Sequence, residues 1–385
     1  MKALVVGGSN GIGLSIVENL LNCGYEQIYV VDRYILKQEY ENVKFIRYNL
    51  INDDLDFLDE ISDIDTLIIT AGFGRVAPFE SMTDIEIINS LKVNTISVMR
   101  IIRKYYSRLL SKDNFNCVVI GSIAGLVNSP LFATYSASKS AICKFIEAIN
   151  IELEMRGTSN RILNVSPGVI DGTSFNGKET NLTEVDDLSK NIIERMNNKD
   201  TLYIPRYNEI YKEVIGRYIK DPVEFGIESY EHKISKSRIN NTPQVKVGYL
   251  SGTFDLFHIG HLNLIKRAKE YCDYLVVGVH KDASHKGKET FILFEERMEI
   301  LRNIKQVDRV IQSKLEDIDV HRDIKYDYLF VGSDYKGTDR FKRYERYFKE
   351  SNVQIVYMPY TLSTSSTQLR DIIDNENNKV AFTME

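Results

Sequence analysis

The sequence predicts an α/β protein built from two doubly wound parallel-sheet domains in tandem. Three observations support this fold class. The chain has 385 residues, more than one hydrophobic core ordinarily organises. Short apolar runs rich in β-branched residues alternate with longer amphipathic stretches, as in strands joined by helical crossovers. The alternation stops once, over residues 221–244, and then resumes.

Composition indicates a soluble globular protein, with 43% hydrophobic and 27% charged residues. The net charge of -5 argues against a nucleic-acid polymer as partner but allows pockets for small phosphorylated ligands. No apolar run is long enough to cross a bilayer, and residues 2–7 already resemble a core strand, which leaves no room for a signal peptide. We therefore expect a cytoplasmic protein with no membrane partner. The four cysteines show no CxxC pairing, so we expect neither disulfides nor a zinc site.

The first domain is expected over residues 1–220. Its expected strands are Lys2–Val6, Gln27–Val31, Val43–Tyr48, Thr66–Thr70, Asn116–Gly121 and Arg161–Ser166. Helices are expected over Ile12–Leu21 and Ser136–Met155. Residues 221–244 combine mixed charges with Ser-Lys-Ser, Asn-Asn and a proline, and we expect a linker there.

The second domain is expected over residues 245–385, as a smaller α/β unit. Its expected strands are Val245–Leu250, Tyr274–Val279, Tyr328–Val331 and Gln354–Tyr357. The tail after Asp374 is polar, and we expect it to fray.

A glycine-rich segment follows the first expected strand and opens the first expected helix. Its glycines allow a tight turn and a close approach of the backbone to a pyrophosphate. The predicted loop contacts are Gly7, Ser9, Asn10, Gly11, Ile12 and Gly13. Asp32 ends the second expected strand, where a carboxylate binds the adenosine ribose hydroxyls of a dinucleotide. Asp32 favours NAD, whereas Arg33 could pair with a 2′-phosphate and admit NADP.

Further motifs follow in order along this domain. They are Thr70-Ala71-Gly72, Ser122 at the end of the fifth strand, Tyr135 and Lys139 four apart on the next helix, and Ser166-Pro167-Gly168. In this order they resemble the short-chain dehydrogenase/reductase family, over roughly the first 215 residues. Thr70 departs from the family's asparagine.

The resemblance implies an NAD(P)-dependent reductase. Tyr135 would donate a proton, Ser122 would bind the substrate carbonyl oxygen, and Lys139 would hold the nicotinamide ribose. Tyr135 and Lys139 share one helix face, so the ammonium group would lower the pKa of the phenol. Asn94 would fix a proton-relay water. Cofactor contacts are further implied for Ala71, Gly72, Lys139, Pro167, Gly168 and Thr173.

A second motif, Gly-Thr-Phe-Asp-Leu-Phe-His-Ile-Gly-His at residues 252–261, follows a strand and leads into an expected helix, Leu262–Tyr271. His258 and His261 lie three apart at the helix start, so their N–H groups and the helix dipole can converge on a triphosphate. A metal site is the alternative for paired histidines. It is disfavoured because no third Cys or His lies at a suitable spacing.

This segment resembles the glycerol-3-phosphate and choline-phosphate cytidylyltransferase group, from about Val245 to Ile373. The resemblance implies CTP as substrate, Mg²⁺ on its phosphates, and His258, His261 and Lys286 as catalytic residues. Nucleotide contacts are implied for Gly252, Thr253, Phe254, His258, His261, Lys286, Arg297, Asp334, Ser365, Ser366 and Thr367. Ser333 and Tyr360 depart from the family pattern, which puts the acceptor-phosphate contacts in question. Both resemblances imply Rossmann-like sheets.

The fusion predicts two consecutive reactions, because tethering raises the effective concentration of the next site. A ketose phosphate reduced to a polyol phosphate would satisfy both sites and give a CDP-polyol, such as CDP-ribitol, for cell-surface polymers. Two alternatives stay open. The transferase could make CDP-glycerol beside an uncoupled reductase, or the reductase fold could serve as an assembly module. Reductase domains of this family commonly pair through helices, which implies a homo-oligomer.

Overall fold

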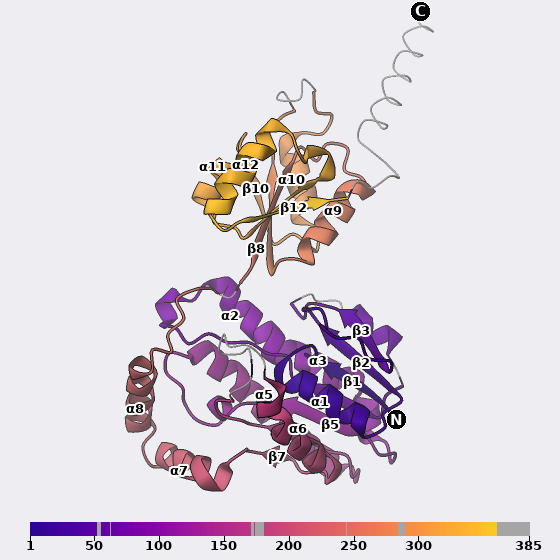
Figure 1. Ribbon diagram of the computed structural model, residues 1–385, viewed down its shortest axis with the longest axis vertical. Coiled ribbons are helices and arrows are strands. Elements are labelled where there is room, and N and C mark those ends of the chain that lie inside the picture. The colour runs from indigo at the N-terminus through magenta and orange to yellow at the C-terminus, as the bar shows by residue number, and fades with distance from the viewer. Residues whose placement is uncertain are drawn as a thin grey trace, which may run out of the picture. The chain divides into compact units, whose positions relative to one another are not determined.

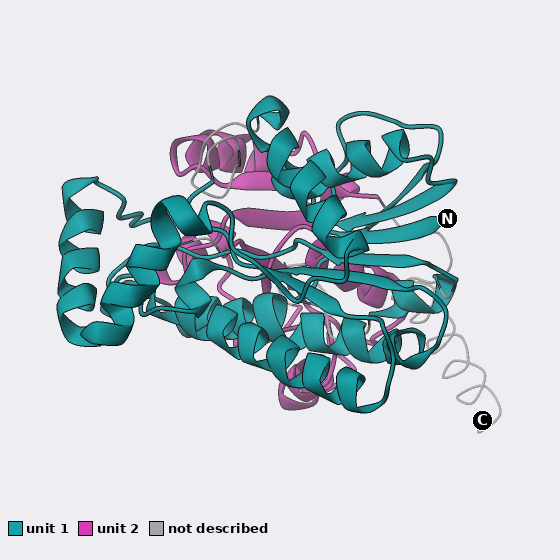
Figure 2. Cartoon of the chain, turned by 90° about the horizontal axis from the view of Figure 1, so that it is seen from below, with its two compact units in different colours: residues 1–244 teal, residues 245–385 magenta. Residues whose placement is uncertain are grey.

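The computed structural model describes residues 1–51, 55–61, 63–170, 173, 181–243, 245–283 and 289–359. The chain forms two compact units, Met1–Gln244 and Val245–Glu385, which Figure 2 shows in separate colours. Each unit contains one parallel sheet with helices packed on both of its faces (Figure 1). The predicted fold class, two doubly wound parallel-sheet domains, is confirmed.

The first unit holds a seven-stranded sheet with the order β3-β2-β1-β4-β5-β6-β7. Its strands are β1 Lys2–Val6, β2 Gln27–Asp32, β3 Val43–Arg47, β4 Thr66–Ile69, β5 Asn116–Ile120, β6 Ile162–Val165 and β7 Leu202–Tyr203. The six predicted strands lie within one residue of these bounds. Strand β7 was not predicted, because two residues are too few to show an alternating pattern.

Side chains alternate across this sheet and bury two separate cores. Leu4 and Val6 of β1 face α3 Ser97–Lys104 and α5 Ala133–Met155. Ala3 and Val5 face α1 Gly11–Asn22 and α6 Leu182–Asn197. The remaining helical segments are η1 Asp56–Glu60, η2 Phe79–Ser81, α2 Asp84–Leu91, η3 Lys92–Ile96, α4 Tyr106–Leu110, η4 Ile123–Gly125, η6 Tyr207–Tyr211, α7 Lys212–Lys220 and α8 Pro222–Ser235.

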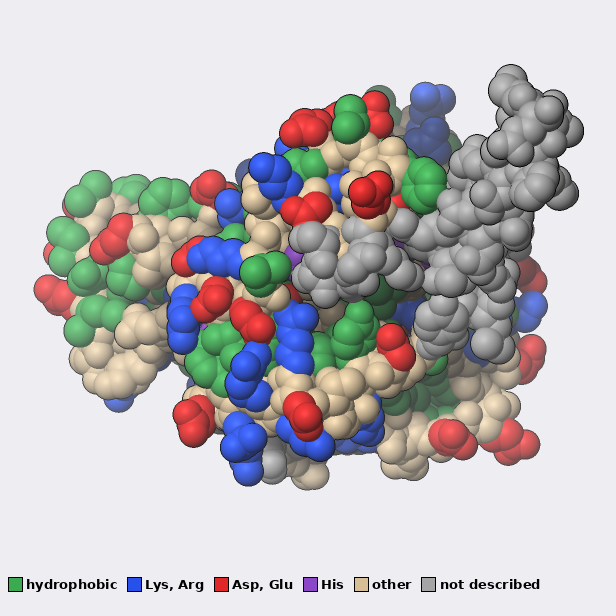
Figure 3. Space-filling model, turned by 90° about the horizontal axis from the view of Figure 1, so that it is seen from above, with side chains coloured by type: hydrophobic (Ala, Val, Ile, Leu, Met, Phe, Trp, Pro, Cys, Tyr) green, Lys and Arg blue, Asp and Glu red, His purple; other side chains and the backbone are tan. Residues whose placement is uncertain are grey.

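The expected linker over residues 221–244 is wrong in its first half, which forms helix α8. Asp221 caps the helix by accepting hydrogen bonds from the backbone N–H groups of Val223 (3.0 Å) and Glu224 (2.9 Å), and proline occupies the first turn. Apolar side chains of α8, such as Ile227, are exposed, as the hydrophobic surface at the left of Figure 3 shows. The helix therefore lacks the buried apolar stripe that sequence patterns detect.

The second unit holds a five-stranded sheet with the order β10-β9-β8-β11-β12. Its strands are β8 Val247–Gly252, β9 Tyr274–Val279, β10 Arg309–Gln312, β11 Tyr328–Gly332 and β12 Gln354–Met358. One face packs α9 Ile259–Lys269 and α10 Phe294–Arg302, and the other packs α11 Asp317–Asp323 and α12 Asp339–Glu350. The four strands predicted for this domain all form.

Both sheets reverse their order beside their first strand, between β1 and β4 and between β8 and β11. Loops leaving the carboxyl ends of strands at such a switch point open a crevice that binds ligands. Both glycine-containing motifs follow these first strands. No helix in the described ranges has the length and apolar character needed to span a membrane.

Candidate active sites

The loop between β1 and α1 accommodates only glycine at two positions. Gly7 has a φ of +90°, and a Cβ on it would lie 2.5 Å from the backbone nitrogen of Ala71. A Cβ on Gly13 would overlap the Gly7 carbonyl. The Thr70 hydroxyl donates to that same carbonyl at 2.9 Å, so threonine ties the loop to β4 where the family has asparagine. Such a loop brings backbone N–H groups close to a ligand.

The end of β2 supplies a fixed carboxylate beside this loop. Asp32 accepts hydrogen bonds from the backbone N–H groups of Ser9 and Tyr34, both at 3.1 Å. The Arg33 guanidinium lies over the Tyr34 ring, 4.8 Å from its centroid. The buried Ser9 hydroxyl has no hydrogen-bond partner among the described residues. A fixed carboxylate, a buried hydroxyl and a glycine cradle together fit a dinucleotide.

A cavity of about 350 Å³ joins this loop to the predicted catalytic residues. The predicted residues that line it are Gly7, Asn10, Gly11, Ile12, Gly13, Asp32, Arg33, Ala71, Gly72, Ser122, Tyr135, Lys139, Pro167, Gly168 and Thr173. Ser9 and Asn94 belong to the predicted set but do not line it. The cofactor loop and the catalytic group thus face one space.

The predicted catalytic trio is buried at the end of this cavity. Tyr135 and Ser122 are 8% and 7% exposed, and Lys139 is 3% exposed. The Lys139 ammonium donates to the Ile120 carbonyl at 2.7 Å and lies 5.7 Å from the Tyr135 ring centroid. The Phe132 ring stacks on Tyr135 with centroids 4.2 Å apart. The phenol is therefore held rigidly and shielded from water.

Burial changes both proton affinities in this trio. It raises the pKa of Tyr135 to about 12, although a hydrogen bond with Ser122 opposes the shift. It lowers the pKa of Lys139 to about 8. The expected fall in the pKa of Tyr135 is not found, because burial dominates and the opposing hydrogen bond comes from Ser122. The phenol consequently stays protonated across the neutral range and can act as an acid.

Asn94 lies in the helical region after β4, as predicted, and its part in fixing a proton-relay water stays a prediction. It is fully buried in η3, and its amide nitrogen donates to the Phe73 carbonyl (2.8 Å) and to the Ser138 hydroxyl (2.9 Å). Its oxygen accepts from the Phe73 N–H at 3.0 Å. Both amide protons are thus used within the protein. The structure shows Asn94 fixing the segment after β4 to α5.

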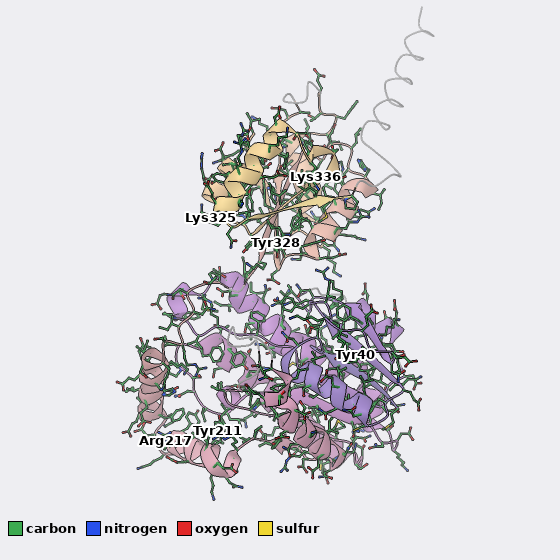
Figure 4. All side chains as sticks on the ribbon, in the orientation of Figure 1. Tyr40, Tyr211, Arg217, Lys325, Tyr328 and Lys336 are labelled. Atoms are coloured by element: carbon green, nitrogen blue, oxygen red, sulfur yellow. The ribbon has the colours of Figure 1, made fainter. Side chains whose placement is uncertain are left out.

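Tyr211 is a supporting residue that the sequence did not reveal. A Cβ on Gly168 would overlap the Tyr211 hydroxyl, so glycine lets the Pro-Gly turn rest on this ring. Tyr211 ends η6, just before α7, and is labelled in Figure 4. No motif could have indicated it, because its role depends on contact between segments more than 40 residues apart.

The start of α9 in the second unit places two histidines side by side. His258 is the N-cap residue, and its Nδ1 accepts a hydrogen bond from the Gly260 N–H at 3.0 Å. The rings of His258 and His261 lie 4.0 Å apart. Burial lowers the pKa of His258, so its neutral ring, with Nδ1 accepting, carries the proton on Nε2. A donor is thereby presented at a helix N-terminus, as phosphate binding requires.

The loop before these histidines is strained and braced. Phe254 and Leu256 have left-handed φ values of 54° and 49°, which non-glycine residues adopt at a cost and mostly at functional sites. The Asp255 carboxylate accepts from the backbone N–H of Ile292 at 2.9 Å, which joins the loop to the segment before α10. The Thr253 hydroxyl is buried with no hydrogen-bond partner in the described parts of the chain.

Phe254 was predicted to contact the nucleotide, but it is only 3% exposed. Its ring lies edge-on to His261, with centroids 5.3 Å apart. The Phe254 ring therefore packs against His261 and helps to hold the imidazole in place.

Arg297 was also predicted to contact the nucleotide, but its guanidinium is directed at the protein's own backbone. It is 1% exposed, and among the described residues its guanidinium donates to backbone carbonyls. The acceptors are those of Thr253 (2.5 Å), Lys281 (2.8 Å), His280 (2.9 Å) and Ile292 (2.9 Å). A planar fork with five N–H donors suits several carbonyls converging on one point. Arg297 thus joins the loops around the histidine pair.

The other predicted residues of this site fall into two groups. Gly252 ends β8, and the exposed Asp334 lies in η8 Ser333–Tyr335 directly after β11, so both are at the switch point. Lys286, Ser365, Ser366 and Thr367 lie outside the described residues, as does Tyr360. Among the described residues, no group of three or more His, Cys, Asp or Glu is placed to hold a metal ion.

Fold and site geometry together define two nucleotide-using enzyme units on one chain. The first has a dinucleotide loop facing a Ser-Tyr-Lys group, and the second has a histidine pair at a helix N-terminus. A short chain dehydrogenase family model matches residues 1–184, and a cytidylyltransferase-like family model matches residues 249–372. The second unit belongs to the cytidylyltransferase-like family, and the first unit is similar to short chain dehydrogenases. The chain joins an NAD(P)-dependent oxidoreductase to a CTP-using nucleotidyltransferase.

Known proteins resemble each unit separately. A glycerol-3-phosphate cytidylyltransferase of Bacillus spizizenii is 39% identical over 127 residues, covering 31% of this chain and 90% of that protein. The vibriobactin-specific 2,3-dihydro-2,3-dihydroxybenzoate dehydrogenase of Vibrio cholerae is 27% identical, covering 43% of this chain and 69% of that protein. A solved short-chain dehydrogenase of Burkholderia cenocepacia in complex with NADP is 21% identical, with a TM-score of 0.47, covering 56% of this chain and 96% of that chain.

Proposed function

We propose that this chain converts a ketose phosphate into a CDP-polyol in two consecutive reactions. The reductase unit reduces the ketone to an alcohol with NAD(P)H. The transferase unit then moves CMP from CTP to the phosphate of the resulting polyol phosphate. The observation that carries the proposal is that one chain joins a carbonyl-reducing site to a transferase similar to enzymes named for a polyol phosphate.

In the reduction, Tyr135 donates its phenolic proton to the substrate carbonyl oxygen. Its raised pKa keeps that proton in place until the oxygen becomes negative. Ser122 hydrogen-bonds the same oxygen, and the positive charge of Lys139 stabilises the phenolate left behind. A nicotinamide cofactor held at the glycine-rich loop would supply the hydride. The Phe132 ring covers Tyr135 and excludes water, so the proton passes from Tyr135 to the substrate oxygen and not to solvent.

In the transfer, a phosphate oxygen of the polyol phosphate attacks the α-phosphorus of CTP. A new phosphorus–oxygen bond forms while the bond to the β-phosphate breaks and pyrophosphate leaves. His258 and His261 donate hydrogen bonds to the charge that develops at phosphorus. Catalysis is mainly positioning, and Mg²⁺ would be brought in on the phosphates of CTP. Lys286, Ser365, Ser366 and Thr367 are proposed to hold those phosphates.

NAD is the proposed reductant, because Asp32 is held at the end of β2 where the adenosine ribose would lie. A 2′-phosphate there would meet a fixed negative charge. Arg33 next to it leaves NADP as the alternative.

A second candidate function is CDP-glycerol synthesis beside a reductase that serves a different compound. The 39% identity to a glycerol-3-phosphate cytidylyltransferase favours it. Reduction of a three-carbon ketose phosphate would itself give a glycerol phosphate, so CDP-glycerol alone does not separate the two candidates. Coupling does. An assembly role for the reductase unit is disfavoured, because Ser122, Tyr135 and Lys139 converge on one cavity.

The test combines a ketose phosphate of three to five carbons with NADH or NADPH, CTP and Mg²⁺ in one vessel, read by mass spectrometry. We expect a CDP-alditol, and we expect its formation to stop when the reduced cofactor is omitted. The transferase should discriminate because a site built to pair a hydroxyl rejects the ketone analogue, by roughly 10⁴-fold at best. A CDP-ketose formed equally well without reductant would refute the coupled function.

A further inference from the structure

Helix α8 and the segment after it form one wall of the reductase cavity, beyond the residues that the dehydrogenase family model matches. At its start, the Asn128 side chain donates to the Pro222 carbonyl at 2.6 Å. After its end, the Asn240 N–H donates to the Val76 carbonyl at 2.9 Å, and the Arg75 guanidinium donates to the Asn240 carbonyl at 2.9 Å. The wall is therefore fixed at both ends to the reductase core.

Arg75 is itself a firm anchor. It is 5% exposed and pairs with the buried Glu86 carboxylate through two hydrogen bonds, at 2.8 and 2.9 Å. A bidentate pair of this kind fixes direction as well as distance. The segment after α8 is thus held in one position at the cavity.

The end of α8 is a Schellman motif that brings two cations together. Ser237 adopts a left-handed φ of 51°, and its N–H donates to the Ile234 carbonyl at 2.9 Å. The Arg238 N–H donates to the Lys233 carbonyl at 3.1 Å, which completes the motif. The two positions joined by this last bond commonly make a hydrophobic contact. Here Lys233 and Arg238 occupy them, and both line the cavity.

This arrangement is costly without an anion. Lys233 is only 5% exposed, although its ammonium group donates to the Ser229 hydroxyl at 2.8 Å. Burial, with a further contribution from the charge of Arg238, lowers the pKa of Lys233 to about 8. In the ranges that the structure describes, no carboxylate forms an ion pair with either residue. A bound anion would stabilise this like-charge pair, in which Lys233 is buried and Arg238 is partly exposed at the same cavity.

The cation pair and the catalytic acid belong to the same cavity. Ser129 and Phe132 line it together with Lys233 and Arg238, and Phe132 stacks on Tyr135. The loop between β1 and α1 already offers backbone donors to a cofactor pyrophosphate. The cations are therefore left for the other ligand of the cavity, the carbonyl substrate.

We propose that Lys233 and Arg238 bind the phosphate group of the carbonyl substrate and make the reductase select phosphorylated over unphosphorylated ketoses. This inference rests on the reductase half of the proposed function. It adds the residues that recognise the phosphate, which come from a segment outside the matched family region.

The test compares Lys233→Met, Arg238→Met and the double variant with the unaltered chain. Methionine keeps the apolar stem of Lys233, so the helix can keep its packing. Lys236→Met, an exposed lysine at the same helix end, is the matched control. Initial rates are measured with dihydroxyacetone phosphate and ribulose 5-phosphate, and with their unphosphorylated forms. We expect KM for the phosphorylated ketoses to rise roughly 10- to 100-fold, the usual worth of a hydrogen bond to a charged group. KM for NAD(P)H and for the unphosphorylated ketoses should stay within about twofold.

Two results would overturn the phosphate site. Equal rises in KM for phosphorylated and unphosphorylated ketoses would show a general packing role, and a rise confined to NAD(P)H would assign the cations to the cofactor phosphates. Compared with Lys233→Met, the variant Lys233→Arg should keep most of the affinity for phosphorylated ketoses, because arginine keeps the positive charge.

A binding measurement separates this inference from the proposed function. Inorganic phosphate is titrated calorimetrically into the full chain and into the double variant, with saturating CTP to occupy the transferase. If the double variant loses one phosphate-binding event but the unaltered chain reduces no ketose phosphate, the anion site stands and the proposed substrate is refuted. If the two titrations are identical but the unaltered chain does reduce ketose phosphates, the proposed substrate stands and the anion site is refuted.

Discussion

The two units solve nucleotide binding alike but arrange their reacting groups differently. Each places a motif after its first strand at a switch point, and each buries one hydroxyl there, Ser9 or Thr253, without a partner among the described residues. In the reductase the reacting groups lie within the core, and burial shifts the pKa of Tyr135 and of Lys139. In the transferase the histidine pair is half-buried at a helix start. Proton transfer needs desolvated groups, whereas phosphoryl transfer needs donors aimed at phosphate.

The largest expected effect is on reduction, and it comes from removing the phenolic oxygen of Tyr135. Tyr135→Phe should lower NAD(P)H oxidation by on the order of 10³-fold, because the proton donor is lost, and should leave cytidylyl transfer unchanged. Absorbance of the reduced cofactor and release of pyrophosphate report the two activities. Tyr40→Phe, which removes only a hydroxyl bonded to Glu18, is the control and should change neither. Equal loss of both activities would contradict separate sites.

The reciprocal experiment uses the transferase. His261→Ala should reduce pyrophosphate release by roughly 10²- to 10³-fold, since it deletes a donor to the charge at phosphorus, and should spare reduction. His232→Ala removes an exposed histidine on α8 and serves as the matched control. Cytidylyl transfer at the normal rate in His261→Ala would remove this residue from the site.

Cofactor choice should respond more weakly. Asp32→Ala removes the acceptor expected for the ribose hydroxyls and the charge that repels a 2′-phosphate. The ratio of kcat/KM for NADH to that for NADPH should fall by about tenfold, the worth of one charged hydrogen bond. Steady-state kinetics with each cofactor measure this ratio. An unaltered chain that already prefers NADPH would contradict the role given to Asp32.

The smallest effect concerns pH. Burial lowers the pKa of Lys139 to about 8, so its ammonium group is charged below that pH and neutral above it. The kcat/KM for reduction should therefore decline by about twofold between pH 7 and 8 and more steeply beyond. Tyr135, with a pKa near 12, adds no decline in this range. The profile is measured in Lys233→Arg as well, which stays charged, so a decline that persists there belongs to Lys139. A flat profile up to pH 10 would exclude the role given to Lys139.

The sequence predicts the parts of this protein that repeat a local rule. Strand bounds follow from apolar runs, and Gly7, Tyr135 and His258 follow from motif spacing. Residues that act through tertiary contact escape it. Phe254 and Arg297 sit inside recognised motifs, yet both are buried supports, because motif position does not tell which way a side chain faces. Lys233 was not predicted as a site residue, because a lysine in a charged stretch outside any motif ordinarily faces solvent.

Arg297 connects three backbone segments around the transferase site, so their opening motions should be coupled. One guanidinium holds carbonyls that follow β8, follow β9 and precede α10. None of these segments can open singly without breaking bonds to the same buried cation. They should therefore open as one cooperative unit, and their amides should exchange hydrogen for deuterium with a shared opening free energy. A nucleotide that steadies one of the three loops would then slow exchange in all of them.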